Sequence, residues 1–266
     1  MADVNTVIIE AYGARISVSA PDRALLDRIV SDLPEGWEPR AAGRDAGSVK
    51  WQFALIHEEA SGYLVRQGNG FETRCGGEAD VAIALLNTQI RRFIGHHARD
   101  LIFVHAGVVA HDGRAIVIPG HSFSGKSTLV AALVRAGAVY YSDEYAVIDE
   151  NGLVTPYREP IAMRDALGRP DLGVTLETLG GSRGEDPIPI GLVVLTTYSP
   201  GSNWSPERLS TARGLLALLE HAIPARDRPK QTLAVLRRAL EDAAILTGPR
   251  GESRVTAEAI LTTRSE

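Results

Sequence analysis

The sequence predicts an α/β protein in which a three-layer domain with a mixed sheet follows a small α+β module. The second part of the chain contains dense apolar runs, which are typical of strands covered on both faces. These runs are Leu101–Ala110, Arg114–Pro119, Ala138–Ile148 and Ile190–Thr197. The first part contains shorter strand patterns and two segments with apolar residues at helical spacing. We therefore expect the small module over residues 1–97 and the larger domain over residues 98–266.

The small module opens with apolar alternation on both sides of Gly13, which predicts a hairpin of Val7–Ala11 and Ala14–Ala20. A helix is expected from Pro21, with the proline in its first position, because apolar residues then recur at helical spacing up to Leu33. The remaining expected elements are strands at Trp51–His57, Gly62–Gln67 and Phe71–Cys75 and a helix at Val81–Ile94.

The end of the larger domain carries two helical patterns, Pro206–His221 and Pro229–Ala243, before a short strand candidate at Ala244–Thr247. The stretch Arg158–Pro189 is rich in Gly, Pro and charged residues and lacks periodicity. We interpret it as a long loop or lid, and loops of this length are often functional.

Composition and charge narrow the classes of partner. The formal net charge of −5 predicts no general attraction to nucleic acid or to anionic lipid. The sequence contains no secretory signal pattern and no apolar run of about 18 residues that would span a bilayer. We expect a cytoplasmic protein with neither nucleic acid nor a membrane as its partner.

The segment Gly120-His121-Ser122-Phe123-Ser124-Gly125-Lys126-Ser127 fits the phosphate-binding pattern G-x-x-x-x-G-K-[ST], and Thr128 follows it. The glycines let the backbone turn so that its N–H groups point at phosphate oxygens. Lys126 would bridge the β- and γ-phosphates, and the Ser127 hydroxyl would ligate Mg²⁺. An apolar strand precedes the loop and a helix ending near Gly137 follows it, which is the context that the motif requires. The sequence thus predicts a P-loop that binds ATP with Mg²⁺.

Two further positions carry polar groups inside apolar strands. Asp143 and Glu144 interrupt the run Ala138–Ile148, where buried carboxylates are costly without a cation or hydrogen-bond donors. A carboxylate near a P-loop normally organises Mg²⁺, although a bulged or edge strand with solvated acids is the alternative. His105 lies in the run Leu101–Ala110, where a core histidine bonded to a backbone carbonyl is the competing interpretation.

From His105 to about Ile148 the chain resembles the catalytic domain of the bacterial HPr kinase/phosphorylase family, in which an ATP-dependent enzyme phosphorylates a serine of a protein partner. The features that carry the resemblance are His105-Ala106-Gly107, a second strand, the P-loop, one helix ending at Arg135-Ala136-Gly137, and the acidic pair on the next strand. Glu144 stands where the family has a second Asp, and the family's glycine-rich downstream segment is missing. The chain is therefore similar to the broader HPr-kinase-related group, which includes peptide kinases.

The resemblance implies a fold of the HPr kinase and PEP carboxykinase type, and it implies roles for three residues. Asp143 would be the general base that takes the proton of the acceptor hydroxyl. Glu144 would help Ser127 and Asp143 to hold Mg²⁺, and His105 would lie beside Asp143 and tune it. The family also tends to form oligomers, which leaves a homo-oligomer open.

The expected function is a kinase that transfers the γ-phosphoryl group of ATP to a hydroxyl, with a serine of a small protein or peptide as acceptor. Two alternatives stay open: a small-molecule kinase of the same fold, and a nucleotide-sensing module without transfer chemistry. Arg226 and Arg228 are candidates for a donor to the γ-phosphate, with solvation at the surface as the alternative.

Overall fold

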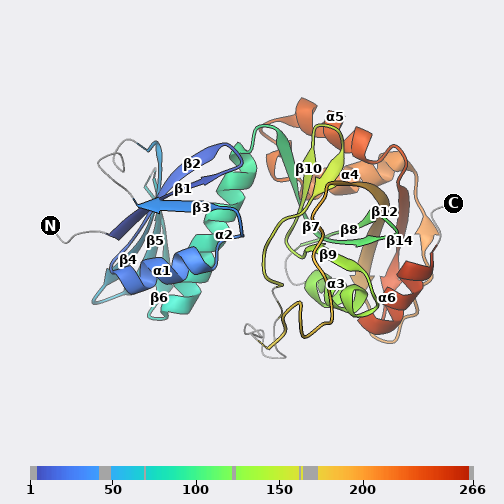
Figure 1. Cartoon of the computed structure of the whole chain (residues 1–266), viewed down its shortest axis with the longest axis horizontal. Coiled ribbons are helices and arrows are strands. Elements are labelled where there is room, and N and C mark those ends of the chain that lie inside the picture. Colours follow the sequence, from blue (N-terminus) through green and yellow to red (C-terminus); the bar gives the residue numbers. More distant parts are fainter. Residues whose placement is uncertain are drawn as a thin grey trace. The chain divides into compact units, whose positions relative to one another are not determined.

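The structure is a computed structural model that describes residues 5–41, 49–68, 70–121, 124–161, 163 and 173–263. The chain divides into two compact units, Met1–Arg99 and Asp100–Glu266. Each unit contains one mixed sheet, and the described residues hold six α-helices in all (Figure 1). The α/β class predicted from the sequence is confirmed.

The first unit is built on a six-stranded sheet with the order β3-β1-β2-β4-β5-β6. Its strands are β1 (Asn5–Ala11), β2 (Ala14–Ala20), β3 (Glu38–Ala41), β4 (Trp51–Glu58), β5 (Gly62–Gln67) and β6 (Phe71–Gly76). The predicted hairpin and the three later strands are confirmed, whereas β3 has no counterpart in the prediction. β2 and β4 are parallel and all other pairs are antiparallel.

Two helices pack on this sheet, α1 (Arg23–Ser31) and α2 (Ala79–His97). The prediction that α1 starts at Pro21 is wrong, because Asp22 takes the N-cap position and its side chain accepts a hydrogen bond from the amide of Leu25 (2.8 Å). Helix α2 is longer than the predicted Val81–Ile94. Its buried face includes Leu86, Ile90 and Ile94, as the helical spacing predicted.

The second unit contains an eight-stranded sheet with the order β11-β10-β7-β8-β12-β14-β13, and β9 pairs with β7 beside this path. The strands are β7 (Leu101–His111), β8 (Arg114–Pro119), β9 (Val139–Ser142), β10 (Tyr145–Asp149), β11 (Leu153–Thr155), β12 (Ile188–Tyr198), β13 (Glu207–Arg208) and β14 (Ala244–Arg250). β8, β12 and β14 are parallel to one another, and β7 is antiparallel to β8 and β10. β11 also pairs with β12, so the sheet curls back on itself.

Helices cover both faces of this sheet, which makes three layers (Figure 1). On one face lie α3 (Lys126–Arg135) and α6 (Ser253–Thr262), and on the other α4 (Thr211–His221) and α5 (Pro229–Ala239). Side chains along β7 point alternately to the two faces of the sheet, so this strand contributes to both cores. Val108 belongs to the core under α4 and α5, and Val109 to the core under α3 and α6.

Several predictions for this unit need correction. The run Ala138–Ile148 forms two strands rather than one, with a break at Asp143 and Glu144. The helix predicted over Pro206–His221 starts only at Thr211, because Ser210 caps it and the preceding residues pair with β14 as β13. Helix α5 ends at Ala239 rather than at Ala243, and both α6 and β11 were missed.

Candidate functional site

The candidate phosphate loop lies between β8 and α3, in the predicted order of strand, loop and helix. Gly125 has a left-handed backbone (φ +80°), which explains the need for glycine at the helix start. A Cβ on Gly120 would lie 2.9 Å from Ser124 Oγ, so a larger residue at this position would require the Ser124 side chain to move. The predicted site residues Ser122 and Phe123 lie outside the described part of the chain.

Lys126 opens α3 and is 7% exposed. Its Nζ donates a hydrogen bond to the carbonyl of His121 (2.8 Å). Burial lowers the pKa of Lys126, while the negative charges of Glu144 and then Asp143 act in the opposite direction. The same charges indicate that both predicted carboxylates lie near the lysine. Ser127 and Thr128 follow in the first turn of α3, where Ser127 is half-buried and Thr128 is exposed.

The carboxylates lie between β9 and β10, which both pair with β7. Ser142 stands opposite Val108 and Tyr145 opposite His105, so the register is the same on both sides of the break. Within the break, the amide of Glu144 bonds to Ser142 Oγ (3.0 Å) instead of continuing the ladder. The predicted interruption of the strand is thus a local turn held by a serine side chain.

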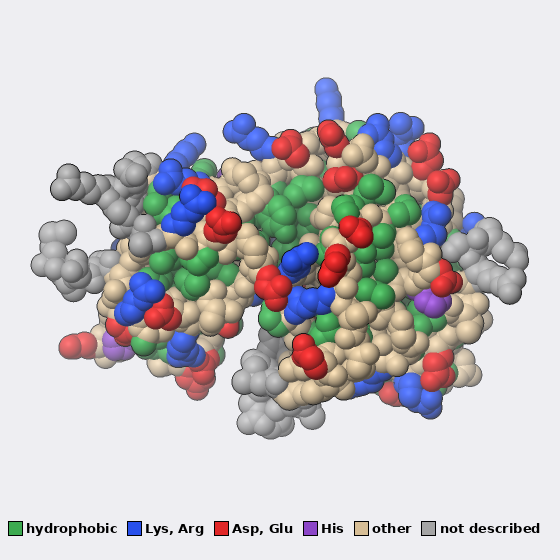
Figure 2. All heavy atoms as spheres, viewed as in Figure 1, with side chains coloured by type: hydrophobic (Ala, Val, Ile, Leu, Met, Phe, Trp, Pro, Cys, Tyr) green, Lys and Arg blue, Asp and Glu red, His purple; other side chains and the backbone are tan. Residues whose placement is uncertain are grey.

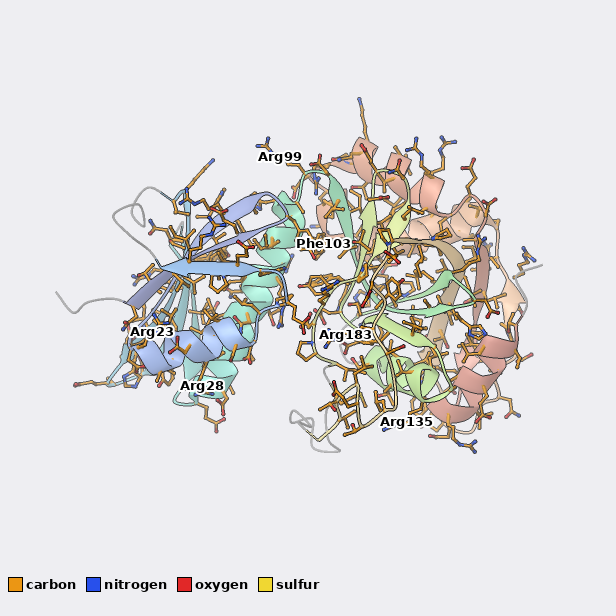
Figure 3. The ribbon with its side chains drawn as sticks, viewed as in Figure 1. Arg23, Arg28, Arg99, Phe103, Arg135 and Arg183 are labelled. Carbon is orange, nitrogen blue, oxygen red and sulfur yellow. The ribbon has the colours of Figure 1, made fainter. Side chains whose placement is uncertain are left out.

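Asp143 and Glu144 have different environments. Asp143 is 3% exposed and one carboxylate oxygen accepts a hydrogen bond from the hydroxyl of Tyr140 (2.9 Å). Arg183, labelled in Figure 3, belongs to the segment before β12, and its guanidinium lies 5.9 Å from the centre of the Tyr140 ring. Burial, together with the charges of Asp143 and Glu159, raises the pKa of Tyr140 well above its ordinary value, so this tyrosine stays protonated and donates.

His105 joins the loop to the carboxylates. Its backbone carbonyl accepts a hydrogen bond from the amide of Gly120 (3.3 Å), and the amide of Ala106 bonds to the carbonyl of Glu144 (3.1 Å). The imidazole Nε2 lies 3.7 Å from a carboxylate oxygen of Glu144. The resemblance implied a position beside Asp143, and the structure places the imidazole against the adjacent carboxylate.

The third residue of the His-x-Gly sequence has a packing role. A Cβ on Gly107 would lie 2.5 Å from a methyl group of Val130 in α3. His105 and Gly107 are two residues apart and therefore face the same side of β7. The missing side chain allows the first turns of α3, with Lys126, to approach the strand that carries His105.

The structure adds His221, which the sequence analysis did not single out. It is the last residue of α4, and its ring centre lies 4.7 Å from that of His121 in the loop. Burial lowers the pKa of His221, and the positive charges of His121, His105 and Lys126 lower it further, against the raising effect of Glu220. The only sequence signal was a polar end to a helical pattern, which does not reveal that α4 ends at the loop.

The two arginine candidates lie elsewhere. Arg228 precedes α5 and its guanidinium bonds to the carbonyl of Leu101 (3.4 Å) and to the side chain of Gln231 (3.2 Å). Leu101 comes four residues before His105 on β7, about 13 Å along the strand. Arg226 is exposed. The contacts of Arg228 therefore favour a role at the start of β7.

Within the described ranges, no group of three or more His, Cys, Asp or Glu side chains is arranged to hold a metal ion by itself. Mg²⁺ in nucleotide sites usually takes one or two carboxylates, several waters and substrate phosphates. The candidates for such an incomplete ligand set are Ser127, which follows Lys126 in the chain, and Asp143 and Glu144, whose charges act on Lys126.

A scan against family models finds no match, and a search of curated proteins finds none either. Among the helices that the structure describes, none is long and apolar enough to cross a membrane. On the face shown in Figure 2, Lys and Arg side chains are interspersed with Asp and Glu side chains.

Proposed function

We propose that the chain is an ATP- and Mg²⁺-dependent kinase that transfers the γ-phosphoryl group to a hydroxyl, with a serine of a small protein or peptide as the expected acceptor. The observation that carries the proposal is the convergence at His105–Ala106 of β7. There the amide of Gly120 bonds to His105, and the amide of Ala106 bonds to Glu144. A buried lysine, a glycine-bounded loop at a helix start and two carboxylates are thereby brought together.

Each group has a distinct part in the proposed reaction. The loop amides and Lys126 bind and orient the β- and γ-phosphates of ATP, helped by the positive end of α3. The acceptor oxygen attacks the γ-phosphorus, its proton passes to Asp143, and ADP leaves with the electrons of the broken P–O bond. Ser127 and Glu144, with Asp143, would hold Mg²⁺, which supplies charge neutralisation on the phosphates when bound.

The surroundings of Asp143 suit a base of fixed position. The Tyr140 hydroxyl holds one carboxylate oxygen, and the same hydroxyl also lies 3.2 Å from the carbonyl of Glu159. Arg183 lies over the ring and bonds to that carbonyl (3.4 Å). A base must be aligned with the proton that it removes, and these contacts restrict the side chain of Asp143.

The deciding experiment incubates the protein with γ-labelled ATP, Mg²⁺ and a host-cell lysate, with Lys126→Ala as the inactive control. Label on a protein or peptide band, absent with the variant, is the expected result. Label on a small molecule would instead identify the small-molecule kinase. ATP binding without any labelled product would identify a nucleotide-sensing module and overturn the transfer step.

A further inference from the structure

Arg250 is a buried cation that lies directly against the phosphate loop. It is the last residue of β14 and is 3% exposed. The ring of Tyr198 covers it, with 5.3 Å between the guanidinium carbon and the ring centre. Burial lowers the pKa of Arg250, but an arginine stays charged in proteins. A charged side chain is seldom buried so completely unless specific partners hold it.

The partners of the guanidinium lie on two segments. Nη2 donates to the carbonyls of Ser124 (3.4 Å) and Gly125 (3.0 Å) in the loop. Nη1 donates to Ser253 Oγ (3.1 Å) and to the carbonyl of Gly251 (3.4 Å) at the start of α6. Arg250 therefore ties the end of the loop to α6, on the side of the loop from which the carbonyls project.

The direction of these carbonyls decides the direction of the neighbouring amides. In a trans peptide unit the C=O and the following N–H point in opposite directions. When the carbonyls of Ser124 and Gly125 face Arg250, the amides of Gly125 and Lys126 face away from it. Those amides belong to the segment that the sequence motif assigns to phosphate binding.

Gly125 makes this close approach feasible. A Cβ at this position would lie 2.5 Å from Nη2 of Arg250, which is too close for any real contact. Two features of this chain therefore require glycine at position 125: the left-handed backbone there and the arginine packed against it.

We propose that Arg250 is a positioning residue for phosphate binding: it holds the carbonyls of Ser124 and Gly125 so that the amides of Gly125 and Lys126 face the phosphates of a nucleoside di- or triphosphate. The inference rests on the nucleotide-binding part of the proposed function and does not depend on the transfer step. In this role Arg250 contacts the loop and does not contact the reacting atoms.

The test measures the affinities for ATP and AMP of the parent, Arg250→Lys and Arg254→Lys. Arg250→Lys keeps the positive charge but loses the two-pronged donor geometry. We expect ATP affinity to fall about tenfold, which corresponds to one lost charge-assisted hydrogen bond, with AMP affinity within twofold of the parent. Arg254→Lys is the matched control, because Arg254 is an exposed neighbour that pairs with Glu258 (2.9 Å), and it should bind ATP like the parent.

Other results would overturn the inference. A folded Arg250→Lys with the parent's ATP affinity contradicts it, and so does an equal loss for ATP and AMP, which indicates general damage. If Arg250→Lys does not fold, Ser253→Ala removes only the 3.1 Å partner of Nη1 and should give a smaller, ATP-selective loss. If the parent protein does not bind ATP, both this inference and the proposed function are overturned. If the parent binds ATP and only the expected effect of the variants is missing, the inference fails and the proposed function stands.

Discussion

The amide of Gly120 donates a hydrogen bond to the carbonyl of His105 (3.3 Å), and this bond attaches the start of the candidate phosphate loop to β7. The same strand carries the turn with the two carboxylates, since β9 and β10 both pair with it. One strand therefore determines the separation of the loop from the carboxylates. Substitutions on β7 and around the loop should therefore change ATP affinity, turnover or stability separately.

Replacing Lys126 by alanine should weaken ATP binding about 10- to 100-fold, because a cation beside the phosphates is lost. The fold should persist, since removing a buried ammonium group also removes its desolvation cost. An ATP titration with circular dichroism measures both effects, and Lys230→Ala on the exposed face of α5 is the control. Unchanged ATP affinity in a folded variant would contradict the assignment of the phosphate loop.

Asp143→Asn should reduce turnover about 10²- to 10⁴-fold with little change in ATP affinity, because the amide cannot accept the acceptor's proton. The amide oxygen can still accept from Tyr140, so the local geometry should remain. Glu144→Gln should instead raise the Mg²⁺ concentration needed for half-maximal rate. A dead Glu144→Gln beside an active Asp143→Asn would mean exchanged roles, and two active variants would place the base elsewhere.

Gly107→Ala should destabilise the second unit by about 1–3 kcal/mol, the usual cost of overpacking a core. The added methyl group would lie 2.5 Å from the fully buried side chain of Val130, between β7 and α3. Chemical denaturation measures the effect, and Gly77→Ala, where the new Cβ meets nothing within 4 Å, is the control. In the double variant with Val130→Ala the two costs should be less than additive, and strict additivity would refute the clash.

The lowered pKa of His221 predicts that the free energy of unfolding depends on pH. Its pKa lies below the ordinary 6.5 in the folded protein, chiefly through burial and then through His121. Between the lowered pKa and 6.5 the unfolded chain binds more protons, so this contribution to stability is complete above about pH 6.5 and is lost as the pH falls through that window. His221→Gln should flatten the profile measured by denaturation between pH 5 and 8. The control is His57→Gln, at an exposed position of β4. A slope in His221→Gln equal to that of this control would contradict the assignment.

Arg228→Ala should lower the stability of the second unit by about 1 kcal/mol, because the hydrogen bond to the carbonyl of Leu101 is lost. Phosphoryl transfer should stay within a few-fold of the parent, since this contact lies at the start of β7. Arg226→Ala, on an exposed side chain, should change neither quantity. A transfer rate reduced a hundredfold in either variant would restore the arginine as a donor to the γ-phosphate.

The elements that the sequence predicted well are those whose signals are local. β8, the loop and α3 follow one another directly, and glycine conformation, apolar periodicity and the motif act over a few residues. Where two local signals competed, the prediction failed. Pro206 resembled a helix start, yet Ser210 caps α4, because the edge of β14 offers hydrogen bonds to the intervening strand. Helix α6 was missed because its buried residues include Thr256 and Ala257, which give little apolar contrast.

The sequence by itself determined a strand–loop–helix unit with a lysine, and it identified the two carboxylates and His105 as polar groups in apolar strands. Only the tertiary structure decided what surrounds that unit. His105 meets Glu144 because β7 pairs with β10 in one register, and His221 reaches His121 because α4 ends beside β7. Arg250 bonds to Gly125 across 125 residues of sequence. Such contacts depend on strand order and register, which are set by how the whole sheet buries its faces, so no local pattern encodes them.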